Sequence, residues 1–214
     1  MSADQSSSNR ILNIYKSRVT ILNFMERLNY VTTDYSTFSI NQIDIMRANS
    51  QLDMLLSHAV EPKKVYIKYY ILNKQIRPQT LDTMIEDLYE IEKILTPRDT
   101  LCIIIDEEPN DRILSSITYL YENTGIFVVI HNIKRLQFNL LEHTLVPSIK
   151  ILNEAEIEEM KKKYNLESFS KLPEISRYDP QALAVMLRPG QVVEFTRSSF
   201  TALESKYYRI CINN

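Results

Sequence analysis

The C-terminal part of this chain is organised around residues 184–212, which read AVMLRPGQVVEFTRSSFTALESKYYRICI. Pro189 restricts its own φ to about −65°, and Gly190 tolerates the positive φ needed at the third position of a type II turn. Two runs rich in β-branched and aromatic residues follow, at 192–196 and 207–212, and they predict two strands. We expect the polar residues 197–206 to form the connecting loop. Together these features predict a two-stranded element that closes a small sheet.

An ordered series of short motifs extends over the last third of the sequence. In chain order these are HTLVP at 143–147, Leu152 ahead of an acidic helix, KY at 163–164, LPEI at 172–175, DP at 179–180, PGQVV at 189–193, RSSFTA at 197–202 and YR at 208–209. No single motif is specific, but the ordered set is. The series resembles the fifth shared subunit of the eukaryotic nuclear RNA polymerases and, along its last third, the small archaeal polymerase subunit that corresponds to it.

The chain departs from the pattern of that family at three positions. Ile149 stands where a second histidine is usual after Val-Pro, Met186 replaces a glycine ahead of the turn, and Leu203 replaces the glycine that follows Thr-Ala. We therefore expect a divergent member, in which the transfer of residue roles is weakest around Leu203.

Composition describes a soluble globular protein with a real core. Of the 214 residues, 44% are hydrophobic and 24% are charged. The sequence contains no apolar run long enough to span a membrane and no secretory signal, and its first nine residues are expected to form a disordered leader. Cys102 and Cys211 each lie in an apolar run, so we expect two buried thiols and an intracellular location. The abundance of Ile, Asn and Tyr is compatible with a protist or a large DNA virus.

Charge argues against a free nucleic-acid binder. The formal net charge is −2, and neither half of the chain carries a strong basic excess. Proteins that bind nucleic acid on their own draw most of their affinity from phosphate neutralisation. If this chain acts on DNA, other chains must supply most of the affinity for DNA.

Hydrophobic periodicity predicts an α/β organisation for the first two thirds of the chain. A helix is expected at 10–28, capped by a serine among Ser6 to Ser8. Arg18 lies on its apolar face, either as a snorkelling residue at the edge or as a member of a buried pair, and the first interpretation is favoured. Further helices are expected at 40–48, 78–95 and 110–123, with Gly125 ending the last, and strands at 52–58, 64–72, 101–105, 126–130 and, on an edge, 136–141. This alternation predicts a largely parallel central sheet.

The C-terminal part is expected to be a separate small domain. Asn153 begins a helix whose acids come first and whose lysines come last, and Asp179 caps a short helix that starts at Pro180. The predicted fold is thus α/β in part and α+β overall. It consists of a three-layer-like α/β domain with a largely parallel sheet at 1–142 and a small α+β domain with a short mixed sheet at 143–214.

The sequence contains no recognised catalytic motif, and it predicts no catalytic residue, metal ligand or cofactor. His58, His131 and His143 have no partners at ligand spacing, and the two glycines of the chain cannot build a phosphate-binding loop. One alternative stays open. Asp106-Glu107-Glu108 follow the apolar run 101–105, where α/β enzymes place metal or acid–base groups, and a metal-dependent nuclease or nucleotide-binding enzyme could pair them with Lys68. The competing interpretation is an ordinary exposed loop.

The resemblance implies a non-catalytic structural subunit of a multisubunit DNA-directed RNA polymerase, whose active site lies in the two largest subunits. Residues 143–214 would then be an assembly domain that docks on the largest subunit, and residues 1–142 a jaw near downstream DNA, touching it weakly or indirectly. No membrane or small-molecule substrate is implied, and the location would be the nucleus or, for a virus, the cytoplasmic virus factory and the virion. The candidate partner-binding residues are His143, Leu145, Val146, Pro147, Asp179, Pro180, Pro189, Gly190, Arg197 and Arg209.

Overall fold

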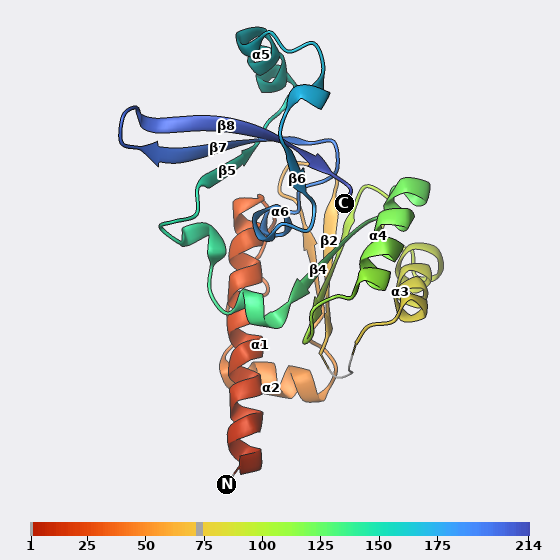
Figure 1. Cartoon of the computed structure of the whole chain (residues 1–214). Helices are drawn as coiled ribbons and strands as arrows, with labels where there is room; N and C mark the ends of the chain where they lie inside the picture. Colours follow the sequence, from red (N-terminus) through yellow and green to blue (C-terminus); the bar gives the residue numbers. More distant parts are fainter. Residues whose placement is uncertain (1, 72–74) are drawn as a thin grey trace. The chain divides into compact units, whose positions relative to one another are not determined.

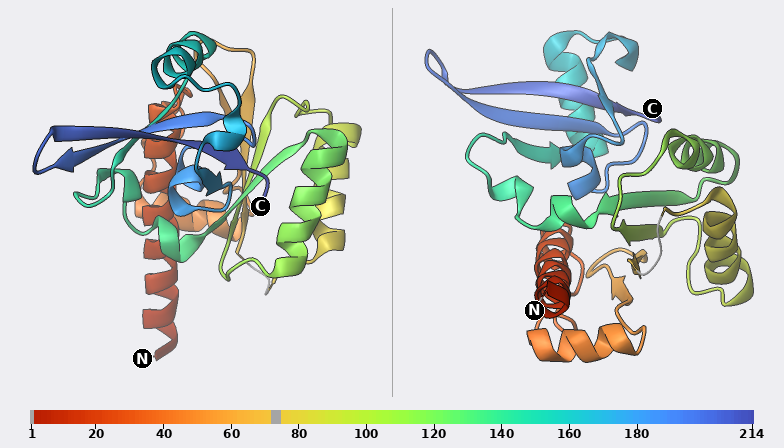
Figure 2. Two further views of the ribbon diagram at one scale, coloured as in Figure 1. Left: turned by 45° about the horizontal axis from the view of Figure 1, so that its top comes forward. Right: turned by 60° about the horizontal axis from the view of Figure 1, so that its bottom comes forward.

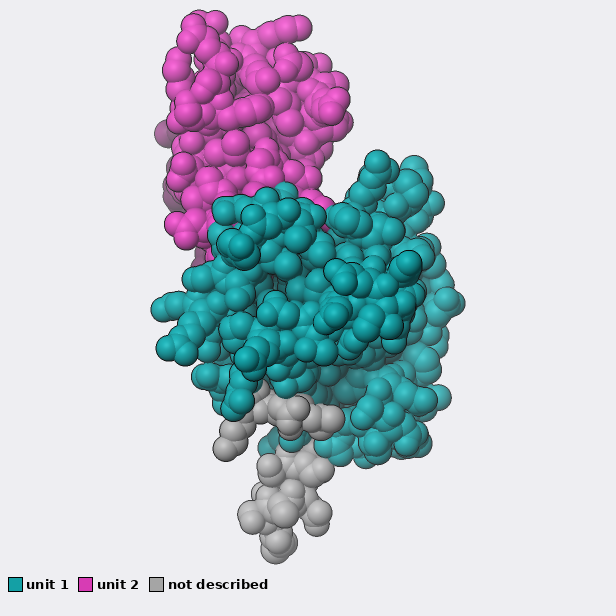
Figure 3. Space-filling view, turned by 90° about the vertical axis from the view of Figure 1, so that its right-hand side faces the viewer, with its two compact units in different colours: residues 1–139 teal, residues 140–214 magenta. Residues whose placement is uncertain are grey.

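The computed structural model describes residues 2–71 and 75–214, with the backbone alone at residues 2–8 (Figure 1). The chain divides into two compact units, residues 1–139 and 140–214, which are coloured separately in Figure 3. The division falls three residues before the predicted domain boundary. No helix in the described part of the chain is both long and apolar enough to cross a membrane.

Unit 1 is built on a four-stranded sheet in the order β1-β2-β3-β4. Its strands are β1 (Met54–Ser57), β2 (Lys64–Tyr70), β3 (Thr100–Ile105) and β4 (Phe127–Asn132). The β1–β2 pair is antiparallel, whereas β2–β3 and β3–β4 are parallel. The largely parallel sheet predicted from the sequence is confirmed.

Helices cover both faces of this sheet (Figures 1 and 2). One face packs against α3 (Pro78–Ile85) and α4 (Asp111–Thr124), with Leu101, Ile103 and Val128 in the shared core. The other face meets α1 (Ser2–Arg27), where Ser17 lies 3.5 Å from the Tyr69 hydroxyl and Phe24 contacts His131. Every residue of β3 and β4 is buried as a result, which explains their continuous apolar sequences.

Three predicted elements of this unit were wrong in extent or type. Helix α1 begins at Ser2 rather than at residue 10, so Ser6 to Ser8 lie inside the helix instead of capping it, and the residues expected to be disordered are helical from Ser2 on. No proline or glycine there opposes helix formation. The helix expected at 78–95 ends as α at Ile85 and continues as the π-helix η1 (Glu86–Ile91). The strand expected at 136–141 is replaced by two 3₁₀ turns, η2 (Ile133–Leu136) and η3 (Leu140–Glu142).

Arg18 is a buried residue and does not snorkel. Its side chain is 2% exposed, and its Nη1 donates a hydrogen bond of 2.9 Å to the Leu52 carbonyl. The guanidinium also lies 5.7 Å from the Tyr35 ring centre and 5.5 Å from that of Phe38. Burial lowers the pKa of this group. The segment after α1, together with α2 (Ile40–Ala48), covers the face of α1 that carries Arg18. Periodicity alone had placed this residue at the edge of the apolar face.

Unit 2 is built on a mixed sheet in the order β5-β7-β8-β6. Its strands are β5 (Ser148–Ile151), β6 (Glu174–Ser176), β7 (Val192–Ser199) and β8 (Leu203–Ile212). The β6–β8 pair is parallel and the other two are antiparallel. Helix α5 (Glu154–Tyr164) covers one face through Met160 and Val192, and α6 (Pro180–Ala184) follows β6. The short mixed sheet predicted for the C-terminal domain is confirmed.

Most of the predicted loop at 197–206 is strand. Strand β7 runs to Ser199 and β8 starts at Leu203, with Arg197 opposite Ser205 and Ser199 opposite Leu203. Backbone pairing therefore continues through polar side chains, because a ladder already in register needs no further apolar residues to extend. The sequence pattern also missed the short strands β5 and β6.

Three other predicted helix ends are confirmed. Asn153 forms a capping box with Glu156 at the start of α5, Asp179 accepts a hydrogen bond from the Gln181 N–H at the start of α6, and Gly125 ends α4 with a φ of 72°. Both thiols are free and buried, and burial raises the pKa of Cys102 to about 12 and of Cys211 to about 11.

Positive backbone φ angles explain where the family pattern has glycine. Gly190 has a φ of 87°, and the Gln191 N–H donates to the Arg188 carbonyl across the turn at 3.1 Å, as the turn prediction requires. Met186 and Leu203 stand at the two positions where the resembled family has glycine, and they have φ angles of 49° and 60°. Both residues therefore occupy a conformation that disfavours a side chain.

Opposite substitutions at Gly190 and Leu203 should change stability in opposite directions. A Cβ at Gly190 meets no atom within 4 Å, so Gly190→Ala should cost about 1–2 kcal/mol through backbone strain alone. Leu203 is 85% exposed, so Leu203→Gly should relieve strain and stabilise by up to about 1 kcal/mol. Chemical denaturation measures both changes. Leu203→Ala, which keeps the strain, is the control, and a Leu203→Gly variant less stable than that control would contradict the argument.

Candidate functional site

One group of predicted partner-binding residues gathers where β5 meets β7. Ser148 pairs with Thr196, so Pro147 lies beside Arg197. Leu145 is 86% exposed, and its N–H donates to the Nδ1 of the exposed His143 at 3.2 Å. Within the described part of the chain, the exposed Arg197 has neither an ion pair nor a hydrogen-bond partner for its side chain. This group, His143 to Pro147 with Arg197, is available for contact and is called the β5–β7 corner below.

The remaining predicted residues lie elsewhere in the sheet and have internal roles. Arg209 donates from Nη1 to the Glu174 carbonyl at 2.8 Å and so links β8 to β6. The Gly190 N–H donates to the Cys211 carbonyl at 2.8 Å, in the turn that follows Pro189. Asp179 and Pro180 begin α6. The structure thus separates this set from the β5–β7 corner, in which His143, Leu145 and Arg197 are exposed and Val146 and Pro147 are half-buried.

Sequence reasoning overlooked the tip of the β7–β8 hairpin. Phe200 is fully exposed there, and Leu203 nearly so. Phe200, a large aromatic residue inside the polar run 197–206, was the available signal. It was overlooked because the whole run was interpreted as a connecting loop. Exposed apolar residues at a projecting tip are typical of a contact surface rather than of a core.

A charged network connects α5 with the sheet of unit 2. The Glu194 side chain is 13% exposed and accepts hydrogen bonds of 2.9 Å from the Tyr208 hydroxyl and the Lys206 Nζ. Burial acts to raise the pKa of Glu194, but these two donors hold it below its usual value. Lys150 pairs with Glu156 beside them, and the group lines a cavity of about 270 Å³. Because these charges neutralise one another, the network is a structural link rather than a binding site for an ion.

The acidic loop after β3 does not converge on one point. Asp106 pairs with Arg10 at 3.2 Å, and Glu108 pairs with Arg135 at 3.0 Å. Lys68, the predicted partner of these acids in the enzyme alternative, pairs instead with Asp53 at 3.5 Å. No cluster of three or more potential metal ligands occurs among the described residues. Two of the three acids are already ion-paired, so the arrangement favours the interpretation as a surface loop.

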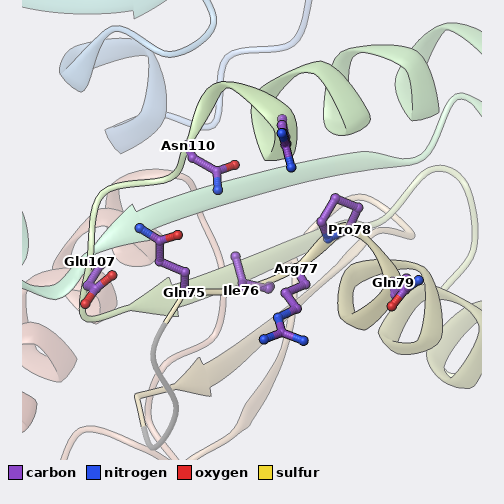
Figure 4. Close-up of a pocket in the computed structure, with 8 residues that line it drawn as sticks. Gln75, Ile76, Arg77, Pro78, Gln79, Glu107 and Asn110 are labelled. Atoms are coloured by element: carbon purple, nitrogen blue, oxygen red, sulfur yellow. The ribbon is translucent and has the colours of Figure 1, made fainter.

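A pocket of about 720 Å³ lies beside this loop, where α3 and α4 begin (Figure 4). The lining residues come from the segment that leads into α3 and from the β3–α4 connection: Gln75, Ile76, Arg77, Pro78, Gln79, Glu107, Asn110 and Arg112. Arg77 and Arg112 are exposed and have no side-chain partner among the described residues. An adjoining pocket of about 500 Å³ shares Pro78 and Arg112 and extends to Tyr119. Two free guanidinium groups beside open pockets suit contact with an extended anion.

Comparison with known proteins identifies the C-terminal unit. The family described as RNA polymerase Rpb5, C-terminal domain, matches residues 138–211. A Thermococcus kodakarensis protein named DNA-directed RNA polymerase subunit Rpo5 is 42% identical over 78 residues, which are 36% of this chain and 94% of the relative. The chain belongs to the Rpb5 family of RNA polymerase subunits.

Two further Rpo5 relatives show the same coverage. The Archaeoglobus fulgidus subunit is 38% identical over 77 residues, with 36% of this chain and 100% of the relative covered. The Methanococcoides burtonii subunit is 40% identical over 76 residues, with 36% and 96% covered. Membership of the Rpb5 family agrees with the prediction of a polymerase subunit rather than a stand-alone enzyme, and it confirms the family resemblance noted in the sequence.

Neutralising the acidic loop should have only a small effect on the isolated Rpb5-family chain. The ion pairs of Asp106 and Glu108 are largely exposed, so Asp106→Asn and Glu108→Gln should each cost less than about 1 kcal/mol. A nuclease assay with Mg²⁺ or Mn²⁺ should show no cleavage by the parent chain. Metal-dependent cleavage that disappears in Asp106→Asn would instead establish the enzyme alternative.

Proposed function

We propose that this chain is a non-catalytic structural subunit of a multisubunit DNA-directed RNA polymerase. Residues 143–214 dock on its largest subunit, and residues 1–142 form a jaw near downstream DNA. The observation that carries the proposal is the coverage of the relatives. Archaeal polymerase subunits are matched over 94% to 100% of their length by only 36% of this chain. Proteins that amount to unit 2 alone are therefore named polymerase subunits, which supports placing the assembly function in that unit.

The β5–β7 corner is the part of unit 2 best suited to docking. Arg197 and Leu145 are exposed, and the Arg197 guanidinium has no partner within the described residues. Arginine that becomes buried in an interface is often a strong contributor to binding because its five donors then find acceptors. Arg209, by contrast, already donates to Glu174, so its part is to hold β6 in the sheet.

Truncating Arg197 should weaken docking of the full-length chain on the largest subunit. We expect Arg197→Ala to lose about 2 kcal/mol of binding free energy, or roughly thirtyfold in Kd. Leu145→Ser should weaken binding to a smaller extent. Titration calorimetry with the purified largest subunit measures both. Arg77→Ala, which removes an exposed arginine from unit 1, is the matched control. Equal binding by Arg197→Ala and this control would rule out the corner as the docking surface.

The jaw role is supported by the free arginines of unit 1. Arg77 and Arg112 lie on neighbouring segments beside the pocket of Figure 4 and have no side-chain partners among the described residues. Guanidinium groups attract DNA phosphates, but two of them on a chain of net charge −2 give weak binding in isolation. Contact with DNA would therefore depend on a polymerase that holds the duplex in place.

Charge reversal at these arginines should act only in the assembled enzyme. In reconstituted polymerase, Arg77→Glu with Arg112→Glu should reduce photo-crosslinking of the subunit to downstream DNA severalfold and make the remaining contact less dependent on salt. The isolated chain should bind duplex DNA feebly with or without the change. Lys171→Glu, an exposed position of unit 2, is the control. Undiminished crosslinking in the doubly substituted enzyme would remove these arginines from the jaw.

Assembly also determines where the protein is found. The chain would accompany the polymerase, in the nucleus of a eukaryote or in the cytoplasmic factory and virion of a large DNA virus. Purification of a tagged chain from its source would then yield the two largest subunits in equal amounts.

A further inference from the structure

The distal half of the β7–β8 hairpin has a free outer edge. Strand β6 pairs with β8 only at residues 210–212, and β5 pairs with β7 only up to Thr196. Beyond these points the hairpin projects as a two-stranded ribbon, visible from different directions in Figures 1 and 2. All residues from Leu203 to Lys206 are exposed. A two-stranded ribbon is only marginally stable alone, and a free edge is a template for another strand.

Hydrogen bonds at the base of β8 fix the direction of its backbone groups. The Ile210 N–H donates to the Pro173 carbonyl, on the β6 side, whereas the Cys211 N–H donates to the Gln191 carbonyl, on the β7 side. Because this direction alternates along a strand, the N–H and C=O of Lys206 point to the free edge, and those of Ser205 point to β7. The Glu204 N–H bonds within the turn to Ala202. The free edge therefore offers the N–H and C=O groups of Lys206 and Tyr208, with the carbonyl of Glu204 beyond them.

We propose that two copies of the unassembled chain associate through this edge, in an antiparallel pairing of β8 with β8 about a two-fold axis at Ser205. In this register Glu204 of each copy lies opposite Lys206 of the other, and Leu203 lies opposite Tyr207. The two Lys206 N–H groups donate to the two Glu204 carbonyls. The sequence LESKY at 203–207 is thus complementary to itself when read in reverse.

Charge selects this register over its neighbours. A pairing centred on Lys206 would place two lysines directly opposite one another, and like charges across strands are destabilising. A pairing centred on Tyr207 would place Glu204 of the second copy opposite Ile210, where β6 already occupies the outer edge. Charged residues at a free edge normally discourage pairing with other strands. Here the order of Glu204 and Lys206 leaves the register centred on Ser205 as the favourable one.

The corresponding edge of β7 is less suitable. Beyond the Ser148–Thr196 pair it offers only Arg197 to Ser199, three residues of strand. Pro147 precedes Ser148 and cannot extend β5 along it by donating a hydrogen bond. The longer edge of β8 is therefore the one available for pairing. An interface of this size is small, so the dimer is weak and reversible.

Disulfide trapping tests the position of the two-fold axis. Ser205 would face its own copy at a non-hydrogen-bonded pair, where Cα atoms of antiparallel strands lie about 4.5 Å apart and a disulfide can form. The Ser205→Cys chain, treated with diamide, which accepts the two hydrogens of the thiols, should yield a covalent dimer within minutes. Ser198→Cys, at a position on β7 that is also exposed, is the control. Cys102 and Cys211 are buried and should not react.

Charge substitutions test the register in solution. Glu204→Lys makes this edge basic, so that variant alone should raise the dimer Kd by about tenfold or more in analytical ultracentrifugation. Lys206→Glu makes the edge acidic and should raise the Kd likewise, and it also removes the ion pair of 2.9 Å that Lys206 makes with Glu194 within its own copy. An equimolar mixture of the two should associate again, because every pair across the mixed interface is then of opposite sign. Circular dichroism of each variant checks that the fold is retained.

Backbone substitution separates edge pairing from side-chain contact. Lys206→Pro removes the outward N–H and should abolish the dimer, whereas Ser198→Pro removes the outward N–H of the other strand and should leave it intact. Monomeric behaviour of the parent chain at every accessible concentration would overturn the proposal. A dimer unaffected by Lys206→Pro, or a mixture of charge variants that stays monomeric, would do the same.

Discussion

Pairing between β7 and β8 is the interaction on which the C-terminal unit depends. It joins eight successive residue pairs, from Val192 opposite Ile210 to Ser199 opposite Leu203. The other two strands each attach to one side of this hairpin, β5 to β7 and β6 to β8, and they do not pair with each other. Without the hairpin, neither short strand would have a partner. Gly190 is the position that aligns the two long strands, since its N–H bonds to Cys211 at the base of the ladder.

A different constraint governs unit 1, in which two parallel strands are buried on both faces. Helices on either side exclude water from β3 and β4 and leave only the ends of the strands for chemistry. In many α/β enzymes the carboxyl end carries the catalytic groups. Here the carboxylates at that end pair with Arg10 from α1 and Arg135 from η2, which ties the loop to the scaffold. An α/β architecture by itself is therefore no evidence of an enzyme, because function depends on the side chains at the site.

Sequence-based predictions were correct where the feature depends on neighbouring residues, and they failed where it depends on tertiary contacts. Local signals worked: the caps at Asn153 and Asp179, the stop at Gly125 and the turn at Gly190 depend on a few adjacent residues. Continuous apolar runs located β3 and β4. Tertiary effects were invisible, and the burial of Arg18 is an example, because the aromatic rings that enclose it come from a segment without periodicity.

The candidate site shows the same division. The motif series correctly indicated the family, but it did not distinguish residues that shape the domain from residues available to a partner. Arg197 and Arg209 looked equivalent in sequence. Only the structure shows that the Arg197 side chain has no partner among the residues described, whereas Arg209 donates to the Glu174 carbonyl. The ends of β7 and β8 were missed because polar side chains concealed a ladder that only the pairing of two strands defines.

Docking and self-association would use neighbouring groups of the same ribbon. Arg197 lies directly opposite Ser205 in the hairpin, so the proposed docking arginine and the proposed two-fold axis belong to the same cross-strand pair. Opposite residues of an antiparallel pair have their side chains on the same face, so a partner that encloses Arg197 also approaches Ser205. A second copy and the largest subunit would therefore compete for this part of the hairpin. Pairing between copies would be confined to the unassembled subunit, where it would cover an exposed edge until the polymerase replaced it.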